Sequence, residues 1–155
     1  MRSIRRRRLE RKTDYKARFI LLKSGRKRIV VRKTNRFIIG QVVETEIAQD
    51  KTIISVTSKD LLKKGWPQEY RGSLKSLPAA YLTGFLLGRL SKEKDIKDAV
   101  LDIGMQRNVH KSRLYAFLKG AIDAGMKIPH QAESLPSSED LQKNQKLATL
   151  INRLK

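Results

Sequence analysis

Four consecutive arginines near the start of the chain are the side chains best suited to binding a polyanion. Arg5 to Arg8 are followed by Arg11 and Lys12, and residues 1–36 hold 16 basic against 2 acidic side chains in a chain of formal net charge +20. A guanidinium group can hold two phosphate oxygens at once, whereas a block of like charges opposes compaction until a polyanion neutralises it. We therefore expect residues 1–12 to form a basic extension that binds nucleic acid.

The basic extension admits two other interpretations. It could be a solvated tail with only non-specific affinity for polyanions, or a segment that binds an anionic membrane. Membrane-surface segments place large apolar side chains opposite the basic face, and residues 1–12 offer only Ile4 and Leu9. The longest mostly apolar stretch, Leu77 to Leu90, has 14 residues, and a membrane-spanning helix needs roughly 20. The sequence therefore favours nucleic acid over membrane.

A second group of cations lies in a loop that leads into a predicted helix. Arg107, Lys111 and Arg113 stand at the start of the helix expected from Ser112 to Ala124. Unpaired backbone N–H groups and the helix dipole favour an anion at such a position. The spacing predicts a second phosphate site, with a solvated loop as the alternative.

The residue types and motifs of the chain do not favour a catalytic site or a metal-binding site. The chain has no cysteine, which excludes disulfides, thiolate zinc sites, iron–sulfur clusters and a cysteine nucleophile. His110 and His130 form no metal-binding motif, and the glycine-rich phosphate loops and nucleophile motifs of enzymes are missing. On a strand, Asp98 and Asp102 would lie about 13 Å apart, too far for a two-metal site, so Asp102 is better interpreted as a partner for a basic neighbour. We expect no enzyme activity, metal, cofactor or small-molecule substrate.

Three short runs rich in β-branched residues predict an antiparallel meander that would position these cations. The strands are expected at Arg28 to Lys33, Phe37 to Val43 and Thr52 to Thr57, with turns at Thr34–Asn35 and Asp50–Lys51. Alternation along the strands assigns one face to the core, with Ile29, Val31, Ile54 and Val56. The opposite face is expected to be cationic, with Arg28 and Arg32.

Helical patterns flank the meander on both sides. Thr13 or Asp14 is expected to cap an amphipathic helix that buries the stripe of Tyr15, Phe19 and Leu22. Ser58 is expected to cap a helical turn. Trp66 in the loop that follows could stack on a base, but we expect it to cover the edge of the core.

The second half of the chain alternates helix, strand and helix. A nearly all-apolar helix from Pro78 to about Lys92 carries small residues at Ala80, Gly84 and Gly88, a line that would let it approach a sheet closely. The apolar run from Ala99 to Ile103 predicts a strand covered on both faces and joined through a helical crossover.

These elements predict a mixed α/β fold in which helices pack on the extended meander. The organisation is a basic extension over residues 1–12, one α/β domain over residues 13–130, and a linker with a C-terminal helix over residues 131–155. That last helix carries a thin apolar stripe of Leu147, Ile151 and Leu154 and could dock on the body or bind a partner.

Five segments of the chain have characteristic sequences and cover most of residues 5–130: RRLERKTDYKAR (7–18), RIVVRKTNR (28–36), PAAYLTGFLLG (78–88), AVLDIGMQR (99–107) and AFLKGAIDAGMKIPH (116–130). In sequence and order they resemble the archaeal and eukaryotic branch of the large-subunit ribosomal protein L-eighteen family. The family binds 5S ribosomal RNA in the central protuberance of the ribosome.

The resemblance implies a structural constituent of the cytoplasmic ribosome, without catalytic activity, that joins 5S ribosomal RNA to the large-subunit RNA beside neighbouring ribosomal proteins. Recognition would rest on phosphate contacts and RNA shape. Carried over by motif, the RNA-binding residues would be Arg5, Arg6, Arg7, Arg8, Arg11, Lys12, Thr13, Tyr15, Arg18, Arg28, Arg32, Lys33, Asn35, Arg36, Arg107, Lys111 and Arg113. The alternatives are a non-specific protein that compacts nucleic acid and a small RNA-processing enzyme.

Overall fold

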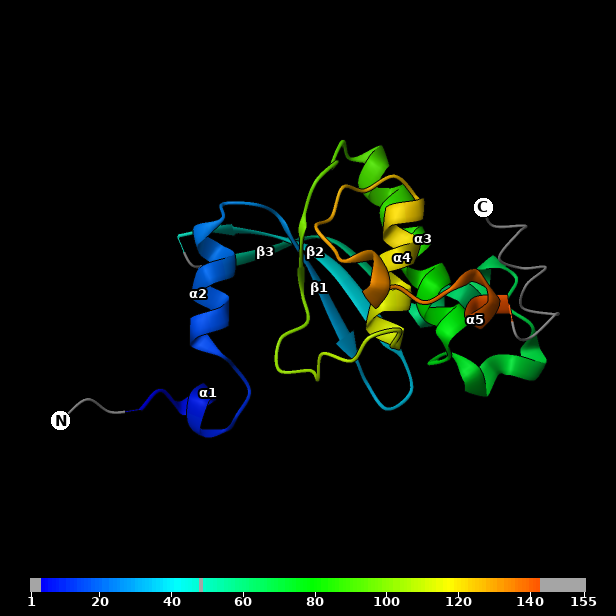
Figure 1. Ribbon diagram of the computed structural model, residues 1–155, viewed down its shortest axis with the longest axis horizontal. Coiled ribbons are helices and arrows are strands. Elements are labelled where there is room, and N and C mark those ends of the chain that lie inside the picture. Colours follow the sequence, from blue (N-terminus) through cyan, green and yellow to red (C-terminus); the bar gives the residue numbers. More distant parts are fainter. Residues whose placement is uncertain (1–3, 48, 143–155) are drawn as a thin grey trace.

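A four-stranded mixed sheet with helices packed against it forms the body of the protein (Figure 1). The computed structural model describes residues 4–47 and 49–142. The strands are β1 (Arg28–Lys33), β2 (Ile38–Glu46), β3 (Gln49–Thr57) and β4 (Val100–Asp102). The helices are α1 (Arg6–Leu9), α2 (Tyr15–Lys23), α3 (Leu77–Glu93), α4 (Arg113–Asp123) and α5 (Ser138–Gln142), with short 3-10 helices η1 (Ser58–Lys64), η2 (Gln68–Ser73) and η3 (Ala132–Ser134).

The strand order β3-β2-β1-β4 combines antiparallel and parallel pairing. β1 is antiparallel to β2 and β2 to β3, whereas β4 runs parallel to β1, with Ile29 opposite Leu101. Parallel neighbours need a long connection, and α3 lies within the one between β3 and β4. The predicted mixed α/β class is confirmed, and the sheet as a whole is a mixed one. β4 is an edge strand whose Val100 and Leu101 are only partly buried, so the expected cover on both faces is wrong.

The hairpin between β2 and β3 is longer than predicted. Asp50 and Lys51 were expected to form a turn, but they lie within β3 and pair with Thr45 and Glu44 of β2. Thr45 Oγ1 donates to Asp50 Oδ1 at 2.8 Å, and two arginines bind the same carboxylate. These interactions hold a residue type that is typical of turns inside a strand.

One face of the sheet forms the core beneath α3 and α4. The alternation in the sequence is confirmed, because Ile29, Val31, Ile54 and Val56 are all buried. Trp66 is buried as well, and its Nε1 donates to the Tyr70 carbonyl at 2.9 Å. Trp66 therefore covers the core, as predicted.

The line of small residues on α3 faces α4 and not the sheet. A Cβ atom at Gly84 would collide with the Phe117 carbonyl of α4, and a Cβ at Gly120 would collide with the Tyr81 carbonyl of α3. The two helix backbones therefore touch through glycine. The sheet also approaches α4 closely at Gly40 of β2, where a Cβ would collide with the Phe117 ring. The prediction that the small residues of α3 allow close packing is confirmed, but they pack against helix α4 and not against the sheet.

The start of η1 also differs in detail from the sequence-based expectation. Thr57, and not Ser58, caps η1, because Thr57 and Asp60 form a capping box. Ser58 is buried and accepts a hydrogen bond from Ile38 N at 3.1 Å, which ties the end of β3 to the start of β2.

The predicted apolar stripe of the C-terminal helix lies outside the described residues. No helix in residues 4–47 and 49–142 is long and apolar enough to cross a membrane.

Candidate nucleic-acid interface

The N-terminal segment, residues 4–23, forms a basic arm that stands beside the sheet (Figure 1). Neither of its helices, α1 and α2, has a buried residue. The four arginines from Arg5 to Arg8 are exposed, and Arg6 Nε lies 2.7 Å from Glu10 Oε1. Hydrogen bonds from Arg6 and Lys12 lower the pKa of Glu10, so this acidic residue stays charged within the arm.

The start of α2 shows how the arm is ordered locally. Asp14, one of two predicted caps, accepts hydrogen bonds from Lys16 N at 2.9 Å and Ala17 N at 3.1 Å. The Arg5 guanidinium lies 4.7 Å from the centre of the Tyr15 ring, which is a cation–π contact. Tyr15 is therefore only partly covered, and it is covered by a cation.

Two large apolar residues of α2 are not packed against the body. Phe19 is 67% exposed and Ile20 is 61% exposed. The expectation that Tyr15, Phe19 and Leu22 form a buried inner stripe is thus wrong for the chain on its own. The amphipathic spacing predicted the helix correctly, but the Phe19 side of the helix is exposed.

A single acidic residue of the sheet anchors the arm. Arg18 Nη2 of α2 lies 3.0 Å from Asp50 Oδ2, while Arg28 Nη2 lies 2.6 Å from Asp50 Oδ1. Burial raises the pKa of Asp50, but hydrogen bonds from Thr45, Arg18 and Arg28 outweigh burial and leave that pKa below its ordinary value. The carboxylate is therefore stabilised in its charged form between the arm and the sheet.

Arg28 belongs to a buried ion-pair network and does not face solvent. Its side chain is only 2% exposed, and its Nη1 donates to Asp102 Oδ2 at 2.8 Å. Arg32 is 41% exposed and donates from Nη2 to Asp102 Oδ1 at 3.1 Å. The prediction that Asp102 partners a basic neighbour is confirmed. The expectation of a cationic face at Arg28 is wrong, because two carboxylates that are distant in the sequence cover it.

The hairpin between β1 and β2 presents the next cations. Lys33, Asn35 and Arg36 are all exposed at this end of the sheet. The loop before α4 lies beside it, since Gln106 Nε2 donates to the Val31 carbonyl at 2.9 Å and Lys33 N donates to Gln106 Oε1 at 3.3 Å. No sequence pattern indicates this role for Gln106, because an uncharged amide in a loop has no characteristic spacing.

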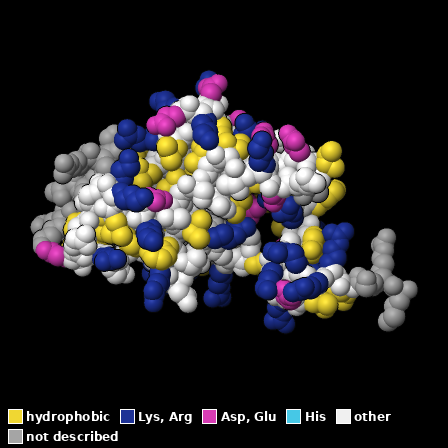
Figure 2. Space-filling view, turned by 180° about the vertical axis from the view of Figure 1, so that it is seen from behind, with side chains coloured by type: hydrophobic (Ala, Val, Ile, Leu, Met, Phe, Trp, Pro, Cys, Tyr) yellow, Lys and Arg dark blue, Asp and Glu magenta, His cyan; other side chains and the backbone are white. Residues whose placement is uncertain are grey.

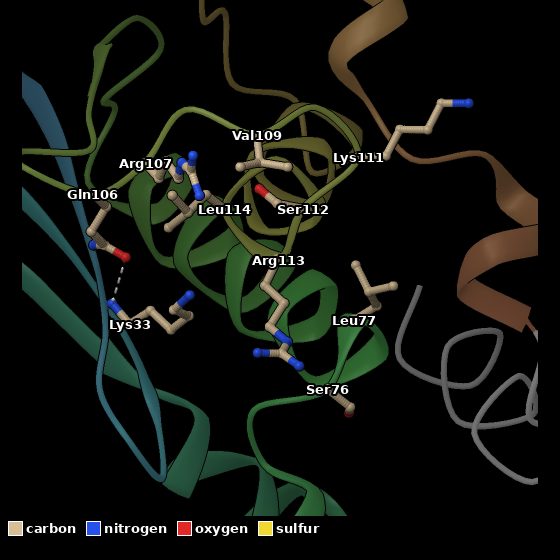
Figure 3. A pocket seen from close by; sticks show the side chains of 10 residues that line it. All are labelled: Lys33, Ser76, Leu77, Gln106, Arg107, Val109, Lys111, Ser112, Arg113 and Leu114. Carbon is tan, nitrogen blue, oxygen red and sulfur yellow. Dashed lines mark hydrogen bonds between the residues drawn. The ribbon is translucent and has the colours of Figure 1, made fainter.

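The structure places Lys33 of the hairpin beside the predicted phosphate-binding loop, around one cavity of about 700 Å³ (Figure 3). Its lining includes Lys33 from the hairpin and Arg107, Lys111 and Arg113 from the loop and the start of α4. Figure 2 shows further Lys and Arg side chains along the lower edge of the body and on the arm, while most Asp and Glu side chains lie in the upper half of that view. Within the described residues no cluster of three His, Cys, Asp or Glu side chains could hold a metal ion.

Comparison with known proteins identifies the family. The sequence model of a family described as "Ribosomal large subunit proteins 60S L5, and 50S L18" matches residues 2–98 and 89–131. Three archaeal relatives carry the name "Large ribosomal subunit protein uL18". The protein of Korarchaeum cryptofilum is 47% identical over 149 residues, which cover 96% of this chain and 74% of the relative.

The other two relatives support the same assignment. The Aeropyrum pernix protein is 46% identical over 86% of this chain and 61% of its own length, and the Methanothermobacter thermautotrophicus protein is 43% identical over 84% and 66%. The chain thus spans about two thirds of the length of these relatives. It belongs to the uL18 family of large ribosomal subunit proteins.

Proposed function

We propose that this chain is a structural constituent of the large ribosomal subunit that binds 5S ribosomal RNA and attaches it to the large-subunit RNA in the central protuberance. The observation that carries the proposal is the basic arm, whose cations other than Arg18 are exposed and which lacks buried residues in both of its helices. Such a segment contributes little to a core and is available to a polyanion. Its setting would be the cytoplasmic ribosome, beside other large-subunit proteins.

The proposed RNA surface extends from the arm to the cavity before α4. Arg28 is left out, because its charge is buried between Asp50 and Asp102. Arg18 and Arg32 each hold one carboxylate and can offer only their remaining N–H groups. The other proposed contacts are Arg5, Arg6, Arg7, Arg8, Arg11, Lys12, Thr13, Tyr15, Lys33, Asn35, Arg36, Arg107, Lys111 and Arg113.

Competitive filter binding tests the proposed partner directly. Labelled 5S ribosomal RNA competes with an equal mass of duplex DNA for the full chain at physiological ionic strength. We expect preferential retention of the RNA, because the surface would be matched to a folded RNA and not to charge alone. Equal retention would instead support the alternative of a non-specific compacting protein. Cleavage or modification of the RNA, with or without magnesium, would support an enzyme.

Removal of residues 1–12 tests the contribution of the arm. We expect the rest of the chain to stay folded, because α1 has no buried residue. The slope of log affinity against log salt should fall by roughly 5 to 6 if each of the seven cations in this segment contacts one phosphate. Circular dichroism checks the fold, and the same filter assay over a salt series gives the slope. An unchanged slope would refute the role of the arm.

A further inference from the structure

The cavity before α4 combines positive charge with an apolar wall. Of its ten described lining residues, four are Lys or Arg and none is Asp or Glu. In Figure 3 the Lys33 and Arg113 side chains project into the same space, whereas Lys111 points away from it. Leu77, Leu114 and Val109 supply the apolar part. The cavity is therefore complementary to a ligand that is anionic at one end and apolar at the other.

The start of α4 supplies the anion-binding end. Ala116 N donates the first helical hydrogen bond, to the Ser112 carbonyl at 2.9 Å, so the amides of residues 113–115 precede the helical hydrogen-bond pattern. Ser112 stands at the N-cap but makes no side-chain cap hydrogen bond, and its buried Oγ has no hydrogen-bond partner. Backbone amides and the Arg113 guanidinium would together suit a phosphate group.

The size of the cavity shows that a phosphate alone would not fill it. A volume of about 700 Å³ lies within the range of small-molecule sites, which is about 300–1,000 Å³. A double helix could not enter, whereas an unpaired nucleotide could place its phosphate at α4 and its base against Leu77. Specific RNA recognition commonly uses such splayed-out bases.

We infer that this cavity binds one unpaired nucleotide of the RNA, with the phosphate held by the start of α4 and Arg113, and the base held by the apolar wall. The inference rests on the proposed function for the choice of RNA over a free nucleotide. It adds a base-accepting site to an interface otherwise made of phosphate contacts.

Amide NMR spectra of the full chain test the cavity without 5S ribosomal RNA. Adenosine 5′-monophosphate, adenosine and inorganic phosphate are the three probes. We expect the monophosphate to shift the amides of residues 113–115 and of Leu77, and to bind at least about tenfold more tightly than adenosine, since a hydrogen bond to a charged group is worth about that factor. Shifts confined to the basic arm, or equal binding of adenosine and its monophosphate, would overturn the inference.

Variants of the cavity separate binding from folding. Arg113→Gln should weaken monophosphate binding about tenfold, whereas Lys64→Gln, which removes an exposed charge outside the cavity, should leave it unchanged. Urea unfolding of both variants should give the same midpoint, which would show that the lost binding does not come from lost folding. Unchanged monophosphate binding in Arg113→Gln would contradict the assignment of its guanidinium to the phosphate.

Binding of 5S ribosomal RNA then separates the two proposals. If Arg113→Gln lowers the salt slope by roughly 0.7 to 0.9 and Lys64→Gln does not, one phosphate of that RNA lies at this site. If the full chain binds the RNA and Arg113→Gln changes nothing, the cavity inference fails and the proposed function stands. If the full chain does not bind the RNA but the monophosphate shifts occur, the proposed function fails, and the site is one for free nucleotides and not for RNA.

Discussion

Replacing Asp102 by Asn tests whether the folded sheet depends on its buried ion-pair network. The Asp102 side chain is 9% exposed and accepts hydrogen bonds from Arg28 Nη1 at 2.8 Å, Arg32 Nη2 at 3.1 Å and Gly104 N at 2.8 Å. An Asn amide keeps the shape and can still accept from Gly104 N. Its NH2 group, however, would face a guanidinium N–H, so two donors would oppose each other and the negative charge would be lost.

The magnitude follows from what Arg28 retains. Removing one partner of a buried pair costs about 3–5 kcal/mol when the other charge is left uncompensated. Arg28 keeps its contact with Asp50 Oδ1 at 2.6 Å, so we expect the lower end, about 3 kcal/mol of unfolding free energy. The control is Glu44→Gln, since Glu44 pairs with Lys27 at 3.8 Å between two half-exposed side chains of the same sheet. That variant should lose at most about 1 kcal/mol.

Urea unfolding of the full chain at pH 7, followed by circular dichroism, measures both variants. Equal denaturant slopes would show that the difference in midpoint reports stability and not compactness. A loss in Asp102→Asn no larger than that in Glu44→Gln would refute the reasoning, because Asp50 alone would then satisfy the buried guanidinium.

Two further predictions concern packing and pH. Gly84→Ala should lower the free energy of unfolding by about 3 kcal/mol, at the upper end of overpacking costs, because the added Cβ would collide with the Phe117 backbone. The control is Gly72→Ala, where a Cβ has no neighbour within 4 Å. In the same urea assay this control should change the free energy of unfolding by no more than about 0.5 kcal/mol. Asp50 has its pKa below the ordinary value of 3.8, so its stabilising contribution is complete above that pH and is lost as the pH falls through the lowered pKa. As the pH is lowered from 5 to 2, the thermal unfolding temperature should therefore fall more steeply for the wild type than for Asp50→Asn. Parallel curves of unfolding temperature against pH would contradict a stabilising role for the charged Asp50 carboxylate.

Local patterns in the sequence predicted the parts of the fold that depend on neighbouring residues. Alternation along β1 placed Ile29 and Val31 in the core, and Asp14 beside an apolar run marked the start of α2. The same alternation placed Arg28 on the opposite face correctly. It could not show that this face is covered there, because Asp50 and Asp102 lie 22 and 74 positions away in the chain.

The cavity before α4 illustrates the same limit at the functional site. The sequence indicated a phosphate site from the charges at Arg107 and Arg113 and their place before a helix. It could not indicate that Lys33, from the first hairpin, would join them, or that Leu77 would provide an apolar wall. Tertiary packing brings these residues together, and Gln106 joins the loop to β1 through a side-chain amide that has no periodic signal.

The conformational entropy of the basic arm opposes RNA binding. A nine-residue helix such as α2 is marginal in water on its own, and its exposed Phe19 and Ile20 side chains bury little apolar surface against the sheet. Ordering the arm on RNA therefore costs conformational entropy that phosphate contacts must offset. The Arg18–Asp50 ion pair and the Arg5–Tyr15 contact reduce that cost, because they hold the arm near its described position before the RNA arrives. The acidic residue of the sheet thus favours binding to a polyanion by fixing the cations that meet it.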